Sequence, residues 1–320
     1  GDGGTILRTS DGGTSWTLQP WGTRKPLYGV FVLAGGGAGI GFAVGDSGTV
    51  LRTTDGGMTW ESRKSGSTDD LYGVFFTDAD RGTAIGRNGT ILRTTNSGET
   101  WISQKCSTNP LRGISLLDDN TGTIVGWNGT ILRTVDGGST WNVQASGTSE
   151  ALEGVVFSDA ATGTAVGHHG TILHTSDGGS TWQPRPSGIT TDLFGVSFTD
   201  SSIGIAVGNN GVILRTSDGG TTWMRPIGAG VNNLYGASLC GDGSGTVVGE
   251  YGMILRTNDG FVTCTSQRKG MIFDLDGIAF TDADVGIAVG DVGTILRTID
   301  GGGEWSQLPS GTTTHLHAVS

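Results

Sequence analysis

Hydrophobic residues recur along this chain in short runs of four to six positions, and glycine, aspartate and asparagine separate the runs. Examples are LYGVFF at 71–76, GTAIG at 82–86 and TILRT at 90–94. Runs of this length with β-branched residues are typical of strands, and the polar residues between them are typical of tight turns. No run keeps the 3.6-residue spacing of an amphipathic helix over three turns. The pattern therefore predicts an all-β protein made of antiparallel hairpins.

One unit occurs eight times in the 320 residues, in forms such as TILRTSDGGTSW at 5–16 and TILRTVDGGSTW at 130–141. The copies end at positions 16, 60, 101, 141, 182, 223, 264 and 305, so the period is near 41 residues. A second pattern lies between the copies, as in LEGVVFSDAATGTAVG at 152–167. A fixed period of this length indicates a repeat protein rather than two unrelated domains.

Each repeat contains four predicted strands, A to D, with the patterns L-x-G-V-x-F, G-x-A-V-G, T-I-L-R-T and T-W-x-x. Four antiparallel strands about every 40 residues are typical of a β-propeller blade. We expect one propeller domain over 1–320, with a half-blade of strands C and D at 1–26, seven full units at 27–311 and a closing A strand at 312–320. This count favours eight blades, with seven as the alternative, closed by pairing of the N- and C-terminal strands. One B strand is missing, which suggests a fragment of a longer chain.

We interpret the D-G-G-x-T-W turns as structural elements of the fold and not as metal-binding or catalytic sites. Each aspartate is expected to accept backbone N–H bonds inside the turn, while glycine supplies a positive φ and tryptophan fills the blade junction. A residue present in nearly every copy serves the blade, because a catalyst is needed only once. The acids at this position are Asp11, Asp55, Asp136, Asp177, Asp218, Asp259 and Asp300. We expect no metal site and no cofactor.

Strand C carries a basic residue in every copy, and we expect these side chains to tie adjacent blades together. They are Arg8, Arg52, Arg93, Arg133, His174, Arg215, Arg256 and Arg297. His174 makes one blade different from the others.

The T-x-D-G-G-x-T-W turn resembles the Asp-box of sialidase-type repeats, and the whole unit is similar to the photosystem II assembly and stability factor family. The resemblance covers essentially the whole chain. It implies a non-catalytic scaffold that holds a protein partner, such as a subunit of a membrane complex. It also implies a location outside the cytoplasm, in the periplasm, the thylakoid lumen or the medium.

Composition narrows the classes of function. The 60 glycines exceed the average share, but 35% hydrophobic residues indicate a folded, turn-rich chain. A net charge of −11 argues against a nucleic-acid partner, and no apolar run is long enough for insertion into a membrane. The six glutamates and four tyrosines do not form the Tyr–Glu pattern that a sialidase requires. We therefore expect no enzyme activity.

The B–C turns and the D–A segments lie on one face of the predicted propeller, and they differ from copy to copy. A two-residue turn explains asparagine and glycine but not an exposed tryptophan, a histidine pair or a tyrosine. The partner-binding candidates are Trp127, His168, His169, Tyr251, Arg87 and Glu250 on the turns, and Trp21, Arg24, Lys25, Arg185, Arg225 and Arg268 in the D–A segments.

We expect this face to be basic and aromatic, the other face to be acidic, and the partner to be a protein segment or a carboxylate-bearing ligand. A second hypothesis is a carbohydrate-binding or glycoside-hydrolase-related module, in which Trp127, Tyr251 and Trp21 stack on sugar rings. A third is a domain of a larger secreted surface protein.

Overall fold

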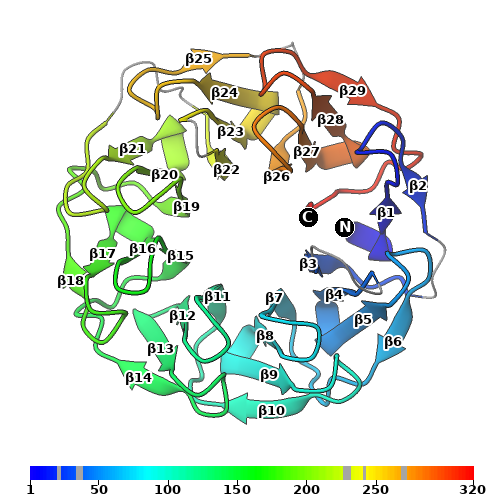
Figure 1. Ribbon diagram of the computed structural model, residues 1–320, viewed down its shortest axis with the longest axis horizontal. Coiled ribbons are helices and arrows are strands. Elements are labelled where there is room, and N and C mark those ends of the chain that lie inside the picture. Colours follow the sequence, from blue (N-terminus) through cyan, green and yellow to red (C-terminus); the bar gives the residue numbers. More distant parts are fainter. Residues whose placement is uncertain (20–22, 34–38, 226–231, 241–242, 268–271) are drawn as a thin grey trace.

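Antiparallel sheets surround a central axis, and their innermost strands face that axis (Figure 1). The computed structural model describes residues 1–19, 23–33, 39–225, 232–240, 243–267 and 272–320. Eight sheets are present in this part of the chain. Seven of them, blades 1 to 7, each arise from one repeat, and the two-stranded sheet β1–β2 is blade 8.

The A, B, C and D strands follow one another outward in each blade. Blade 1 contains β3 (Leu27–Val32), β4 (Gly41–Gly45), β5 (Thr49–Thr53) and β6 (Glu61–Arg63), and blade 2 contains β7 (Leu71–Phe76), β8 (Gly82–Gly86), β9 (Thr90–Thr94) and β10 (Ile102–Lys105). Blade 3 contains β11 (Leu111–Leu116), β12 (Gly122–Gly126), β13 (Thr130–Thr134) and β14 (Asn142–Gln144), and blade 4 contains β15 (Leu152–Phe157), β16 (Gly163–Gly167), β17 (Ile172–Thr175) and β18 (Gln183–Pro184).

The remaining blades follow the same order. Blade 5 contains β19 (Leu193–Phe198), β20 (Gly204–Gly208) and β21 (Ile213–Thr216), and its D segment pairs only through a bridge between Arg215 and Met224. Blade 6 contains β22 (Leu234–Leu239), β23 (Gly245–Gly249), β24 (Met253–Thr257) and β25 (Thr265–Ser266), and blade 7 contains β26 (Leu275–Phe280), β27 (Gly286–Gly290), β28 (Ile295–Thr298) and β29 (Ser306–Leu308). Blade 8 contains β1 (Leu7–Arg8) and β2 (Thr17–Leu18).

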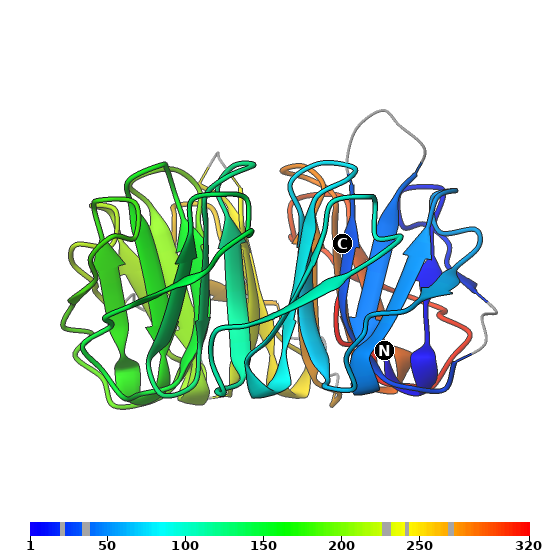
Figure 2. The ribbon, with the colours of Figure 1, turned by 90° about the horizontal axis from the view of Figure 1, so that it is seen from below.

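Short 3₁₀ turns precede strand C at one face of the ring, and in the complete blades they connect it to strand B. They are η1 (Asp2–Gly4), η2 (Asp46–Gly48), η3 (Arg87–Gly89), η4 (His168–Gly170), η5 (Asn209–Gly211), η6 (Glu250–Gly252) and η7 (Asp291–Gly293). In blade 3 a turn at 127–129 takes this place. We call this side, with the D–A loops, the tip face, and the opposite side, with the Asp-boxes and the A–B loops, the box face (Figure 2).

The core lies between neighbouring blades. Every B strand of blades 1 to 7 is buried along its whole length, because it is flanked in its own sheet and covered on both sides. Box tryptophans close the junctions, as where Trp101 packs edge-on against Phe42 of the preceding blade. The apolar segments are too short to form a core within one blade, so stacking against neighbours supplies it.

The two ends of the chain meet in blade 8. The Leu316 amide donates to the Gly290 carbonyl of blade 7 at 3.0 Å, as the Leu27 amide donates to the Gly1 carbonyl at the next junction. The Asp2 amide donates to the His315 carbonyl at 2.9 Å, and a matching bond joins each other B–C turn to the residue before strand A. The C-terminal segment therefore takes the place of an A strand, and the two ends of the chain meet there. In the described residues this segment forms no strand and β1 pairs with β2 alone, so the predicted pairing of N- and C-terminal strands is not seen, because no B strand lies between them.

The predicted all-β propeller with antiparallel four-stranded blades is confirmed. The structure has seven complete blades, the number that the sequence analysis gave as the alternative to eight, although the fourth strand of blade 5 is reduced to a bridge. In the described residues, blade 8 has no B strand. The described part of the chain also contains no helix with the length and hydrophobicity of a membrane-spanning segment.

Candidate functional site

The Asp-boxes hold the C–D turns, as the sequence predicts. In the box of blade 1, Asp55 Oδ1 accepts the Thr59 amide at 2.9 Å and the Thr53 hydroxyl at 2.8 Å, while Oδ2 accepts the Thr59 hydroxyl at 2.6 Å. These bonds lower the pKa of Asp55 to about 2, led by the Thr59 hydroxyl. Gly56 and Gly57 have φ of 70° and 80°, which a residue with a Cβ adopts only with strain. The acids of the boxes are thus committed to the turn.

The basic residues of strand C join the blades. Arg133 Nε donates to the Gly178 carbonyl in the box of the next blade at 2.7 Å. Equivalent bonds connect Arg8 with Gly56, Arg93 with Gly137, Arg215 with Gly260, Arg256 with Gly301 and Arg297 with Gly12. Arg52 instead pairs with Glu99 of the next box at 2.6 Å. The prediction that these side chains tie adjacent blades is confirmed for these residues.

The tip face is not uniformly basic, which corrects the expected separation of charge. In four of the tips, the second residue donates its amide to a side chain just before the next A strand: Asn210 donates to Asn233, and three others donate to an acid, Ser47 to Asp70, His169 to Asp192 and Tyr251 to Asp274. These bonds are 2.9–3.0 Å long. Because the turns need these acceptors, acids recur on the face where only bases were expected.

The innermost strands carry a second set of varied residues near the tip face. The residue after the constant leucine of each A segment is half-buried, and its type varies around the ring. We call this set the inner ring. It consists of Tyr28, Tyr72, Arg112, Glu153, Phe194, Tyr235, Asp276 and His317.

Half of the inner ring forms an aromatic and cationic sector. The His317 and Tyr28 rings are 5.8 Å apart, and the Tyr28 and Tyr72 rings are 6.0 Å apart. The Arg112 guanidinium lies 4.6 Å from the centre of the Tyr72 ring and 5.4 Å from that of Trp127. Trp127 is 41% exposed on its tip, so the sector runs from the ring's inner wall to the open face. Burial, followed by the nearby acids, raises the pKa of Tyr28.

The two histidines of blade 4 bind different acids. His168 lies 3.2 Å from Glu153 of the inner ring, and His169 lies 2.7 Å from Glu150 of the preceding loop. The hydrogen bond with Glu150 raises the pKa of His169. Glu153 also faces Arg112 at 3.7 Å, so His168 joins the aromatic sector through this carboxylate. The side chains of the histidine pair therefore diverge.

The other predicted binding residues are spread around the ring. Tyr251 is 49% exposed on the tip of blade 6, beside Glu250, and blades 4 and 5 separate that blade from Trp127's blade 3 (Figure 1). The Arg87 guanidinium is exposed and lies 3.4 Å from Asp70. Arg24, Lys25 and Arg225 are exposed as well. Arg185 differs, because it is half-buried and, after burial of the imidazole itself, contributes to lowering the pKa of His174. Trp21 and Arg268 lie outside the described residues.

The structure brings together Trp127, His168 and three inner-ring residues that the sequence analysis did not select: Tyr28, Tyr72 and Arg112. A signal for them exists in the repeat. The position between the constant leucine and the glycine of strand A varies in character from blade to blade, from tyrosine to arginine to aspartate.

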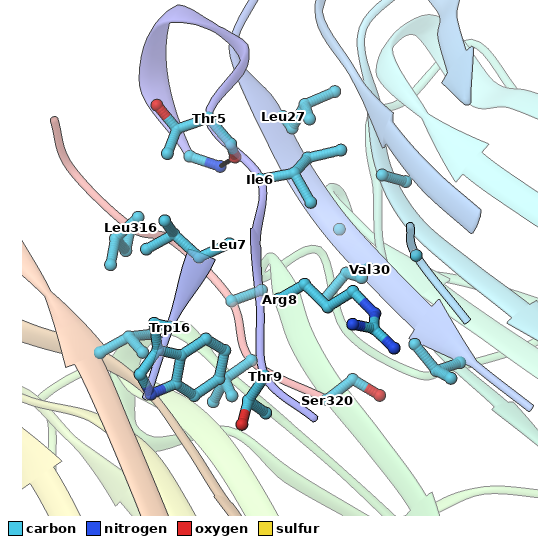
Figure 3. Close-up of a pocket in the computed structure, with 18 of the residues that line it drawn as sticks. Thr5, Ile6, Leu7, Arg8, Thr9, Trp16, Leu27, Val30, Leu316 and Ser320 are labelled. Atoms are coloured by element: carbon cyan, nitrogen blue, oxygen red, sulfur yellow. Dashed lines mark hydrogen bonds between the residues drawn. The ribbon is translucent and has the colours of Figure 1, made fainter. Parts of the chain in front are cut away.

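A cavity of about 240 Å³ lies in blade 8, and Tyr28 of this sector is one of its lining residues. It is lined by β1, by β3 of blade 1 and by the C-terminal segment, and its wall is largely apolar, with Ile6, Leu7 and Leu316 among the lining residues (Figure 3). It occupies the place that a B strand takes in the other blades, between strand C and the A-strand segment.

Blades of antiparallel strands, with Asp-box turns between the third and fourth strands, define an Asp-box β-propeller. The model of the family described as photosynthesis system II assembly factor YCF48 matches residues 33–109, 106–184 and 146–225, which together span more than half of the chain. The protein therefore belongs to the photosystem II assembly factor YCF48 family. No curated protein sequence matches the chain.

Several solved structures share the fold. "YCF48 bound to D1 peptide" is 20% identical with a TM-score of 0.60, over 75% of this chain and 80% of that chain. "YCF48 from Cyanidioschyzon merolae" is 18% identical with a TM-score of 0.60, over 77% and 87%. The computationally designed Ika8 protein is 13% identical with a TM-score of 0.76, over 92% and 90%.

Proposed function

We propose that this protein is a non-catalytic assembly factor that binds an extended segment of a protein partner on its tip face, outside the cytoplasm. The observation that carries the proposal is the sector formed by His317, Tyr28, Tyr72, Arg112 and Trp127. Aromatic rings next to an arginine are the residue types that dominate binding energy at protein interfaces.

The chemistry of the sector defines the partner. Tyrosine and tryptophan offer apolar faces with polar edges, and Arg112 offers a planar cation for a carboxylate. Glu153 stands beside this cation and further acids lie on the tip face, so the partner segment combines apolar side chains with both signs of charge. A chain terminus or an acidic side chain of the partner would compete with Glu153 for Arg112.

Membership in the YCF48 family supports a partner from a membrane complex. One member of this family has been solved with a D1 peptide bound. By this relationship we propose a subunit of a photosystem-type complex as the partner.

The test is a titration of fluorescently labelled peptides that together cover D1, read by fluorescence anisotropy. The double variant Arg112→Ala, Trp127→Ala removes the cation and the exposed ring of the sector. We expect it to weaken binding of the peptide that wild type selects by about 30-fold, the effect of losing a ~2 kcal/mol hot spot.

A second double variant, on the box face, controls for the general effect of losing one positive charge and one apolar side chain. Arg81→Ala with Ile299→Ala removes a half-exposed guanidinium and an exposed apolar side chain away from the sector. Its peptide affinity should equal that of wild type. Equal loss in both double variants, or no loss in the first, would overturn the proposed site, and retention on polysaccharide without peptide binding would replace the function with the carbohydrate hypothesis.

A further inference from the structure

We propose that Asp276, His315 and His317 form a binding site for a divalent transition-metal ion, with Zn²⁺ as the reference ion. The site lies where the C-terminal segment meets β26 of blade 7. One ligand atom from each of the three residues lies within 4.8 Å of the other two. His317 belongs both to this site and to the aromatic sector, but the proposal does not depend on the proposed function, because it concerns the closure of the ring and is tested without changing a residue of the sector.

His315 stands between two carboxylates. Its Nδ1 is 2.9 Å from Asp291 Oδ1, and its Nε2 contacts Asp276 Oδ2. Carboxylates only accept hydrogen bonds, and a neutral imidazole has one N–H to donate. One of the two nitrogens therefore needs either a second proton or a cation. If Nδ1–H donates to Asp291, the Nε2 lone pair and the Asp276 oxygen point at the same place, which is the arrangement of two metal ligands.

The surroundings supply the outer shell of such a site. Metal-binding histidines usually donate their other N–H to a carboxylate, which fixes the tautomer and the orientation of the ring. Asp291 has this relation to His315, and Asp2 lies 2.9 Å from His317 Nε2 on the far side of the pair. The two imidazole rings are 4.4 Å apart. Each histidine thus has a carboxylate of its own besides Asp276.

Charge and ligand type indicate the class of ion. Three carboxylates surround two imidazoles that are uncharged when neutral, and a divalent cation would offset most of that charge. Two nitrogens and one oxygen suit Zn²⁺, Co²⁺ or Ni²⁺, whereas Mg²⁺ and Ca²⁺ prefer oxygen ligands alone. Three protein ligands leave a fourth tetrahedral position for water.

The ion would join the closing segment to its neighbour. His315 and His317 belong to the C-terminal segment, whereas Asp276 belongs to blade 7 and Asp2 to η1 of blade 8. Ion binding would therefore stabilise the closed ring, since a ligand that binds only the native state raises its stability.

The test uses tag-free protein that has been stripped with a chelator and dialysed. Isothermal titration with Zn²⁺ should give one ion per chain and a higher melting temperature, and Co²⁺ should give the visible absorption of a tetrahedral site. Mg²⁺ should give neither signal. Asp276→Asn and His315→Gln should each abolish the Zn²⁺-dependent rise in melting temperature, and Asp291→Asn should weaken Zn²⁺ binding by about 10–100-fold.

His169→Gln is the matched control, because it removes a histidine that also pairs with a carboxylate but lies on another blade. It should bind Zn²⁺ as wild type does. Binding of Zn²⁺ at less than one ion per chain by wild type would overturn the proposal, as would undiminished binding by the Asp276→Asn and His315→Gln variants. Circular dichroism of each metal-free variant shows whether it is folded. If His315→Gln does not fold, the comparison of Zn²⁺ binding by Asp291→Asn and by wild type tests the proposal instead.

Discussion

At the scale of single residues, His174 is the position where the repeat departs from arginine. Its side chain is 5% exposed, and its Nδ1 has no hydrogen-bond partner within the described residues. Burial, followed by repulsion from Arg185, lowers the pKa of this imidazole. The residue is therefore neutral in the folded protein near pH 7, although an unfolded chain would take up a proton near pH 6.5.

This difference predicts a pH-dependent loss of stability. The unfolded state binds a proton at His174 more readily than the native state, so the free energy of unfolding should fall as the pH drops below about 6.5 toward the lowered native pKa. His174→Gln cannot take up the proton, and its stability should depend less on pH over this window. Urea unfolding at several pH values between 7 and 5 measures the difference.

His169→Gln should change the pH dependence of stability in the opposite direction. The native pKa of His169 is raised by Glu150, so its contribution is present below about pH 6.5 and is lost as the pH rises through the native pKa. Identical pH profiles for wild type and His174→Gln would show that this imidazole is not held neutral by burial.

At the scale of elements, the junction between neighbouring blades is the repeated unit of stability. In blade 3, Arg133 reaches from the middle of β13 to the Gly178 carbonyl in the box of blade 4. That carbonyl belongs to a turn already held by its own aspartate, Asp177. The bond therefore connects two ordered groups, and little further entropy is lost when it forms.

Arg133→Met keeps most of the apolar stem and removes the donor. We expect the variant to lose about 2 kcal/mol, the usual effect of losing a hydrogen bond from a charged group. Arg87→Met is the control, because its guanidinium is exposed on the tip face and should contribute less than about 1 kcal/mol. Chemical unfolding followed by tryptophan fluorescence compares the two, and an equal effect in both would contradict the role given to the junction bond.

Some of the contacts between blades could be predicted from the sequence, and others could not. The roles of Asp55 and Arg133 followed from repetition, because a residue type present in nearly every copy must serve what the copies share. Tyr72 and Arg112 were missed because they come from successive repeats and meet only when the blades stand side by side. The prediction of a basic tip face was wrong because it counted the bases alone. It left out acids such as Asp70 and Asp192, which accept hydrogen bonds from the backbone of the turns.

At the scale of the whole molecule, blade 8 is the place where the ring is least supported. β1 has one partner strand, β2, and a cavity of about 240 Å³ lies on its other side. Successive residues of an antiparallel strand direct their amides to opposite neighbours. In blade 5, Arg215 and Met224 each donate a backbone N–H to the carbonyl of the other. Arg8 is the equivalent of Arg215 and pairs with β2, so its amide points to β2. The amide of the preceding residue, Leu7, therefore points to the cavity.

Amide hydrogen exchange should therefore distinguish equivalent leucines. Leu132 of blade 3 has the same place in its C strand as Leu7, but it lies between two paired strands. We expect the Leu7 amide to exchange much faster than the Leu132 amide under native conditions, because local opening is easiest where fewest bonds must break. Nuclear magnetic resonance reads the two sites in one sample, and equal protection would mean that blade 8 is as tightly held as the complete blades.

The bonds between strand C arginines and boxes run in one direction around the ring, and Arg297 of blade 7 donates to Gly12 of blade 8. A linear repeat protein has end units with a neighbour on one side only, so it can lengthen by adding a unit next to a cap. A closed ring has no end unit next to which a repeat could be added. A duplicated repeat would have to change the angle at every junction at once or remain outside the ring as an unpaired loop. The number of repeats is therefore a property of all the junctions together, and gene duplication can change it only when every contact between blades tolerates a new curvature.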